Sequence, residues 1–144
     1  VILKSMESMN LRVERKAENA VAVADFLSSH DAVDRIYYPH HSSHPQHELA
    51  RRQMSHGGTI LSFTIPGGRD EAFALLNQLE LIDISNNLGD SKSLACHPAS
   101  TTHEGIGPEG RDVMGIGENL IRLSLGLEHK DDLIGDLAHA LGAL

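Results

Sequence analysis

The chain has 144 residues, of which 40% are hydrophobic and 22% charged, and one domain of this length and composition can bury its own core. Its formal net charge of −8 argues against a nucleic-acid surface, and no apolar run approaches the roughly 18 residues of a membrane span. The first residues are charged too early for a signal peptide, and a single cysteine fits a reducing compartment such as the cytoplasm.

The first thirty residues carry the most regular pattern in the chain. Apolar side chains recur every three or four positions, which predicts a long amphipathic helix over 3–29. The repeating positions are Met6, Met9, Val13, Ala17, Ala20, Ala24 and Leu27. If this face is uncovered, it forms an apolar patch that favours self-association. We therefore expect a homo-oligomer or a missing partner segment.

The middle of the chain alternates short strands with helices. Runs rich in β-branched and aromatic residues, bounded by glycine or proline, predict strands. Longer runs with helical periodicity predict helices. In chain order, we expect a strand at 33–39, a polar loop leading into a helix over 40–54, a strand at 59–65, a helix at 69–81 and a short strand at 82–85.

Glycine, serine, threonine and proline dominate residues 86–119, which predicts a region that is mostly loop with a helical turn at 108–114. Residues 120–128 then predict a strand, and 129–141 a helix capped by Asp131 or a neighbour. The order of elements favours an α+β fold. A small, mainly antiparallel sheet would carry helices on one face, with the long helix preceding it.

Two motifs resemble functional sites but fit ordinary structural roles better. Residues 40–47, HHSSHPQH, contain four histidines, but structural zinc usually needs convergent ligands that include cysteine. We expect a solvated loop without a metal, and keep metal binding as an alternative. Residues 105–110, GIGPEG, match a nucleotide-binding pattern without the preceding strand that its mechanism needs. They predict a turn into a short helix.

Cys96 and His97 are adjacent, so their side chains should point apart instead of forming a nucleophile–base pair. We expect Cys96 to be a small buried side chain, and we assign no catalytic residue to this chain. Arg122 differs because it lies inside the apolar strand, with Ser124 on its own face and Leu123 on the other. Its guanidinium needs either a bound carboxylate or an internal acid, and the residues alone leave both open.

Four segments resemble the C-terminal portion of the Cys/Met-metabolism pyridoxal-phosphate (PLP) enzymes. They are LKSMESMNLRVERKAENA, HPQHELARRQMSHGGTILSF, NNLGDSKSLACHPASTTHEG and GIGENLIRLSLGLEHKDDLIGDLAHAL. The resemblance covers essentially the whole chain. It implies a connecting helix over 1–30, followed over 31–144 by the small C-terminal domain of an aminotransferase-like PLP enzyme.

The resemblance also implies a binding site. Arg122 corresponds to the arginine that grips the α-carboxylate of the amino-acid substrate. Asn87 stands where the family often has serine, and its amide can also donate to a carboxylate. The implied pocket lining is Leu88, Gly89, His97, Ser100, Thr101 and Thr102.

The same resemblance implies that PLP is the parent enzyme's cofactor, held by a lysine in an N-terminal domain outside this chain. None of Lys4, Lys16, Lys92 and Lys130 resembles that lysine segment, so we expect no cofactor on the chain alone. The implied substrate is an O-acylhomoserine in methionine biosynthesis, and the segments look most like a sulfhydrylase. The alternatives are a cystathionine γ-synthase or methionine γ-lyase domain, or a non-catalytic small-ligand or assembly module.

Overall fold

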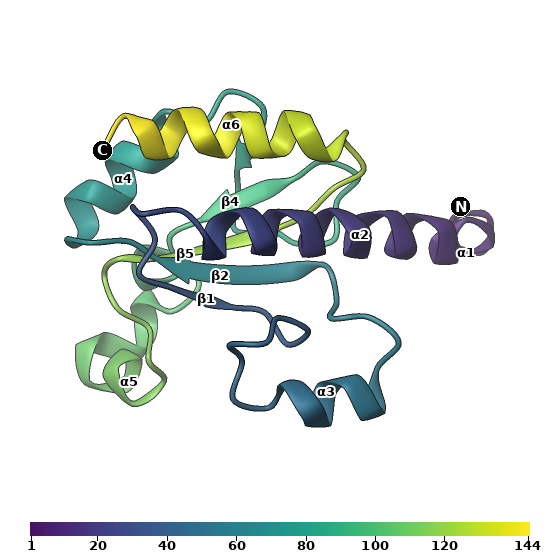
Figure 1. Ribbon diagram of the computed structural model, residues 1–144, viewed down its shortest axis with the longest axis horizontal. Helices are drawn as coiled ribbons and strands as arrows, with labels where there is room; N and C mark the ends of the chain where they lie inside the picture. The colour runs from purple at the N-terminus through teal and green to yellow at the C-terminus, as the bar shows by residue number, and fades with distance from the viewer.

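A five-stranded sheet lies at the centre of the computed structural model, which describes residues 1–144 (Figure 1). All neighbouring strands pair antiparallel except β3 and β4, which are parallel. From edge to edge the order is β1 (Arg35–Tyr37), β2 (Ile60–Thr64), β5 (Leu120–Ser124), β4 (Leu94–Cys96) and β3 (Asp83–Ile84). The structure therefore confirms an α+β fold built on a mainly antiparallel sheet.

Three helices form a layer over one face of this sheet. The long helix α2 (Met9–Ser28) contacts β1, β2 and α6 (Lys130–Gly142), and α6 contacts α4 (Arg69–Asn77). The shorter helices α3 (His47–Gln53) and α5 (Gly107–Val113) lie outside this layer, below the sheet in Figure 1. No helix is both long and apolar enough to cross a membrane.

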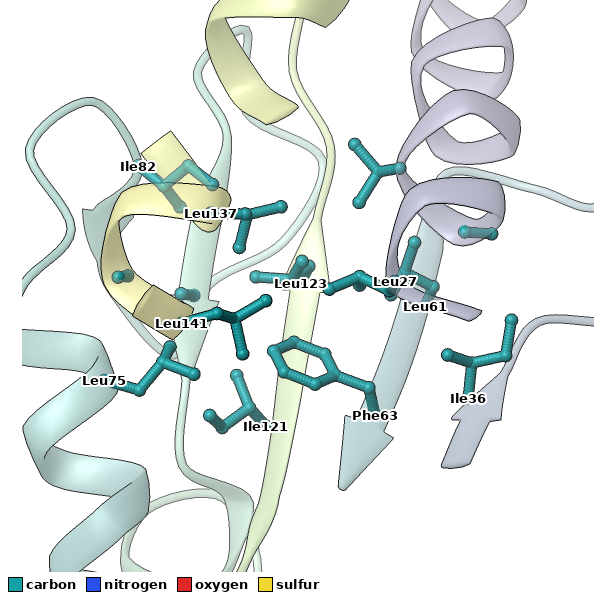
Figure 2. Close-up of a cluster of buried hydrophobic side chains, with 14 of the residues drawn as sticks. Leu27, Ile36, Leu61, Phe63, Leu75, Ile82, Ile121, Leu123, Leu137 and Leu141 are labelled. Carbon is teal, nitrogen blue, oxygen red and sulfur yellow. The ribbon is translucent and has the colours of Figure 1, made fainter. Parts of the chain in front are cut away.

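The hydrophobic core fills the space between the sheet and this helical layer (Figure 2). Alternate residues of the central strands point into it, including Leu61 and Phe63 of β2 and Ile121 and Leu123 of β5, all at most 1% exposed. This alternation is the period-2 pattern of a half-buried strand. It turns the intervening residues of β5, Arg122 among them, toward the other face.

The first helix differs from the expected single helix over 3–29. It is interrupted at Ser8, which separates α1 (Ile2–Glu7) from α2, and α2 ends at Ser28. Only the second half of the apolar stripe is buried, because the sheet and α6 reach no further along the helix (Figure 1). Ala20 and Leu27 are fully buried, whereas Met6 is 54% exposed and Met9 50% exposed.

The prediction that 86–119 is mostly loop misses β4, which lies in the sheet beside β5. Three residues are too few to show a period, and the strand forms because Ala95 pairs with Leu123 in the core.

The helix predicted over 69–81 ends earlier, at Asn77. The last helix is capped by His129, whose ring Nδ1 accepts the Asp131 N–H at 3.3 Å. The short helix expected at 108–114 is confirmed as α5, which begins within GIGPEG at Gly107.

Tyr38 supplies a pH-dependent contribution to stability. Its side chain is 1% exposed, its hydroxyl donates to the Gly58 carbonyl at 3.1 Å, and burial with a smaller effect from Asp25 raises its pKa to about 12. Because the pKa is higher in the folded state, this contribution is complete below pH 10 and is lost as the pH rises toward 12.

We expect Tyr38→Phe to lower the free energy of unfolding by about 1 kcal/mol at neutral pH, through the lost hydrogen bond. The variant should also lose less stability than the parent between pH 10 and 12. Urea denaturation across that range measures both effects, with Tyr37→Phe as the control. An equal alkaline loss in Tyr38→Phe and the parent would contradict the assignment.

Candidate functional site

Arg122 occupies the middle of β5, on the face turned away from the core. Its cross-strand neighbours are Ser62 of β2 and Cys96 of β4. Nη2 donates to the backbone carbonyls of Asn86 at 3.0 Å and Asn87 at 3.1 Å. No aspartate or glutamate oxygen lies within 4 Å of the guanidinium, so the internal ion pair that the residues left open does not form. The buried Nε has no hydrogen-bond partner at all.

The loop after β3 supplies those two carbonyls. Asn87, Leu88 and Gly89 are exposed, and Leu88 shows 58% of its surface. Gly89 has a φ of 80°, a left-handed conformation that favours glycine, and its N–H donates to Ser124 Oγ at 3.0 Å. The loop is therefore attached directly to β5 beside Arg122.

A cavity of about 440 Å³ opens next to this loop. It is lined by Phe73, Leu76, Asn77, Ile84, Ser85, Asn86, Cys96, His97, Ser100 and Thr101. Asn86 and Cys96 connect it to Arg122, since one accepts a hydrogen bond from the guanidinium and the other is its cross-strand neighbour. A cation with free hydrogen-bonding capacity beside a part-apolar pocket can orient a small anionic ligand.

The structure brings together only some of the residues expected to line a pocket. His97, Ser100 and Thr101 lie in the cavity wall, whereas Leu88 and Gly89 do not. Arg122 and Asn87, the residues expected to bind the carboxylate, also lie outside the wall and adjoin it through Cys96 and Asn86. Thr102 is also outside it, with its hydroxyl 2.8 Å from the His103 ring. The apolar part of the wall, made by Phe73, Leu76 and Ile84, was missed by sequence reasoning. No local signal marks these residues, because α4 and β3 reach the cavity only through the fold.

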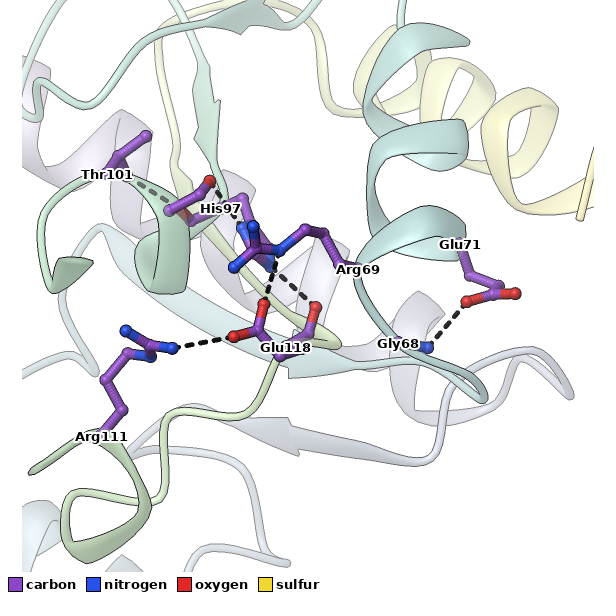
Figure 3. A network of polar contacts seen from close by, with 8 residues as sticks. Gly68, Arg69, Glu71, His97, Thr101, Arg111 and Glu118 are labelled. Carbon is purple, nitrogen blue, oxygen red and sulfur yellow. Dashed lines mark hydrogen bonds and ion pairs between the residues drawn. The ribbon is translucent and has the colours of Figure 1, made fainter. Parts of the chain in front are cut away.

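His97 fixes the shape of the cavity wall (Figure 3). Its ring is 2% exposed, with Nε2 2.7 Å from the Glu118 carbonyl and Nδ1 2.8 Å from Ser100 Oγ. A carbonyl only accepts, so Nε2 carries the proton and Nδ1 accepts from the serine hydroxyl. Thr101 Oγ1 donates to the His97 carbonyl at 2.8 Å. Both hydroxyls are thus held by one buried histidine.

Two arginines bind the side-chain carboxylate of Glu118. Arg69 Nε lies 2.8 Å from its Oε2, and the buried Arg111 Nη2 lies 2.9 Å from its Oε1 (Figure 3). The Arg69 hydrogen bond is the largest cause of a pKa for Glu118 below its usual 4.5, and Arg111 adds to the effect. This arrangement anchors the segment before β5 to α4 and α5.

We expect this carboxylate to stabilise the fold above pH 4.5 and to lose that effect as the pH falls through its lowered pKa. Glu118→Gln should therefore flatten the acid side of the stability profile. Urea denaturation from neutral pH to pH 3 measures the slope, and Glu109→Gln, on the exposed side of α5, is the control. An unchanged slope in Glu118→Gln would contradict a contribution from the ion pairs.

Cys96 is 2% exposed, as expected of a small buried side chain. Burial raises the pKa of its thiol, although the positive charge of Arg122 and a hydrogen bond with Thr101 oppose that shift. A thiol with a raised pKa is mostly protonated at neutral pH and is a weak nucleophile. Cys96 therefore shapes the cavity wall, and its thiol is not expected to react as a nucleophile.

No three histidine, cysteine, aspartate or glutamate side chains lie close enough to hold a metal ion, including those of the 40–47 loop. Ring nitrogens in that loop instead contact nearby polar groups. His41 Nδ1 lies 2.8 Å from Ser43 Oγ, and His44 Nδ1 accepts the Gln46 N–H at 3.1 Å. These local contacts account for two of its four histidines.

The family model of Cys/Met metabolism PLP-dependent enzymes matches residues 1–142. The chain belongs to this family. Among curated relatives, it is 48% identical to an O-succinylhomoserine sulfhydrylase of Mycobacterium tuberculosis, over 98% of this chain and 36% of the relative. It is 42% identical to an L-methionine gamma-lyase of Porphyromonas gingivalis, over the whole chain and 36% of that relative.

A solved structure supports the same family assignment. The cystathionine gamma synthase of Xanthomonas oryzae pv. oryzae, in complex with aminoacrylate and cysteine, matches with a TM-score of 0.94 and 36% identity. The match covers 98% of this chain and 36% of that one. The chain therefore has the fold of the family's C-terminal region, and it spans about 36% of the length of the relatives it matches.

The family cofactor does not fit the residues present here. PLP is held as a Schiff base by a lysine, and no lysine lines the cavity. Lys16 is buried and hydrogen-bonded to the Gly89 carbonyl, and Lys92 forms an ion pair with Asp83. Lys4 and Lys130 lie exposed on helices. The chain accordingly offers a cavity beside Arg122 but no lysine in the wall of that cavity to hold PLP.

Proposed function

We propose that this chain is the substrate-binding C-terminal domain of a PLP-dependent enzyme that acts on O-succinylhomoserine or O-acetylhomoserine. The reaction replaces the γ-acyloxy group with a sulfur nucleophile, a step of methionine biosynthesis. The observation that carries the proposal is Arg122, a cation on a core strand with no acid partner and a cavity beside it. The sulfhydrylase relatives at 48% and 43% identity support the choice of substrate.

In this proposal Arg122 binds the substrate α-carboxylate, and the Asn87 amide donates a second hydrogen bond to it. His97, Ser100 and Thr101 of the cavity wall contact the rest of the amino acid, and Leu88, Gly89 and Thr102 border the site outside that wall. Holding the carboxylate fixes the direction of the Cα–H bond, which is a positioning contribution to catalysis. No residue of this chain acts as an acid, base or nucleophile.

The proposal places PLP and its lysine in a preceding N-terminal domain, with residues 1–30 as the connecting helix and 31–144 as the small domain. The exposed apolar residues of α1 and the start of α2, including Met6 and Met9, favour contact with that domain or with a second copy. We propose a cytoplasmic homo-oligomer.

The test uses the full-length protein supplied with PLP. O-succinylhomoserine and O-acetylhomoserine are each incubated with sulfide, and homocysteine is measured as the product. The proposal expects homocysteine from at least one of them, at a higher kcat/KM than thiol release from methionine. Efficient thiol release from methionine with no homocysteine from either ester would reject it in favour of elimination.

A methionine γ-lyase or cystathionine γ-synthase activity is the second candidate, because relatives of those kinds match at 42% and 36% identity. A third reading is a non-catalytic module, since the cavity and Arg122 lie wholly within this chain. Calorimetry of the 144-residue chain with O-succinylhomoserine and methionine distinguishes a binding module from an enzyme domain. Tight binding without the preceding domain favours the module.

A further inference from the structure

Two polar side chains lie on the buried face of α2, where an apolar residue would be the ordinary choice. Lys16 is 5% exposed and Asn19 is 1% exposed, and their spacing of three residues puts them on one face of the helix. Lys16 Nζ donates to the Gly89 carbonyl at 2.9 Å. Asn19 Nδ2 donates to the carbonyls of Gly126 at 3.0 Å and Glu128 at 2.9 Å.

The Lys16 side chain therefore binds the loop that contacts Arg122. The Gly89 N–H donates to Ser124 Oγ while its carbonyl accepts from Lys16, so the residue is held from both sides. Asn86 and Asn87, three and two positions before Gly89, supply the carbonyls that bind the guanidinium. One continuous set of hydrogen bonds thus joins α2 to the loop and the loop to β5.

Folding stability gives no reason for an ammonium at this position. Burial lowers the pKa of Lys16, and the nearby Arg12 lowers it further, against smaller raising effects of Asp90 and Glu128. No carboxylate oxygen lies within 4 Å of Nζ, and its only hydrogen bond goes to a neutral carbonyl. Even buried ion pairs can often be replaced by apolar residues without loss of stability, and the Lys16 ammonium has no carboxylate to offset its desolvation.

We propose that Lys16 is a positioning residue for the carboxylate subsite. Its ammonium holds the 86–89 loop against β5, so that the Asn86 and Asn87 carbonyls orient the Arg122 guanidinium toward the substrate α-carboxylate. This inference rests on the proposed function, because it assigns Lys16 a role in the same subsite.

The experiment replaces Lys16 by methionine, which keeps the length of the side chain and removes the charge, in the full-length protein with PLP. We expect KM for the O-acylhomoserine substrate to rise about ten-fold, the scale of one hydrogen bond from a charged group, with kcat unchanged. The urea midpoint should stay equal or rise. Lys16→Arg, which keeps the donor, should restore most of the affinity, and Lys130→Met on the exposed start of α6 is the control.

A second readout separates positioning from general damage. Amide hydrogen exchange over residues 86–89 should accelerate in Lys16→Met while exchange in β5 is unchanged. A KM equal to that of the parent in Lys16→Met, with Arg122→Ala impaired, overturns the role of Lys16 alone. Unchanged kinetics in both variants overturn the proposed function itself. A fall in the urea midpoint together with the rise in KM assigns Lys16 a structural role and also overturns the inference.

Discussion

Arg122→Ala is expected to raise KM for the amino-acid substrate of the full-length protein by about 30-fold or more. Removing one partner of a buried, charged hydrogen-bonded pair costs about 2–5 kcal/mol of binding, and 2 kcal/mol corresponds to about 30-fold in affinity. The guanidinium is well suited to this role because Asn86 and Asn87 bind only Nη2, through neutral carbonyls. No aspartate or glutamate oxygen lies within 4 Å of the guanidinium to compete with a bound carboxylate.

Steady-state kinetics with the wild type and three variants measure this effect. Arg122→Lys keeps the charge but loses the planar fork that binds a carboxylate through two hydrogen bonds, so it should fall between the wild type and Arg122→Ala. Arg35→Ala, on the exposed edge strand β1, is the matched control and should leave KM unchanged. Unchanged KM and kcat in Arg122→Ala would remove the main support for the proposed site.

Asp136→Ala is expected to lower the free energy of unfolding by about 3 kcal/mol. The carboxylate of Asp136 is 8% exposed and accepts the backbone N–H groups of Glu80, Leu81 and Ile82 at 2.8, 3.1 and 2.9 Å. Its removal leaves three amide donors near the core without an acceptor, at about 1–3 kcal/mol for each one that stays buried. These amides form the turn between α4 and β3.

Urea denaturation measures the loss, and Asp132→Ala on the exposed side of α6 is the control. A surface substitution of that kind is expected to change stability by less than about 0.5 kcal/mol. Asp136→Asn keeps one carbonyl oxygen as an acceptor and should be intermediate. A loss in Asp136→Ala as small as that of Asp132→Ala would show that the turn does not depend on the carboxylate.

Asp136 and Lys16 illustrate two uses of a charged group in this fold. The Asp136 carboxylate satisfies three backbone donors, so the network explains its burial by stability alone. The Lys16 ammonium makes one hydrogen bond, to the loop beside Arg122, and gains little stability there. The contrast is the physical reason to expect Asp136 variants to change folding and Lys16 variants to change substrate binding.

The amino-acid sequence was sufficient to predict the features that depend on local periodicity. Alternation in β5 placed Arg122 and Leu123 on opposite faces of the sheet, and the three-to-four spacing predicted the apolar face of α2. The family segments predicted the fold class. These features follow from neighbours in the chain, because a period of 2 or 3.6 residues is visible within one element.

The remaining features depend on contacts between segments that are distant in the chain. The strand at Leu94–Cys96 forms through pairing with β5, the cavity needs Phe73 of α4 beside Ile84 of β3, and Lys16 meets Gly89 across 73 residues of chain. The end of the apolar stripe, at which Met9 is exposed, likewise depends on how far the sheet and α6 extend. Such contacts join residues distant in sequence, and no local pattern encodes which distant segment will cover, pair with or bind a given residue.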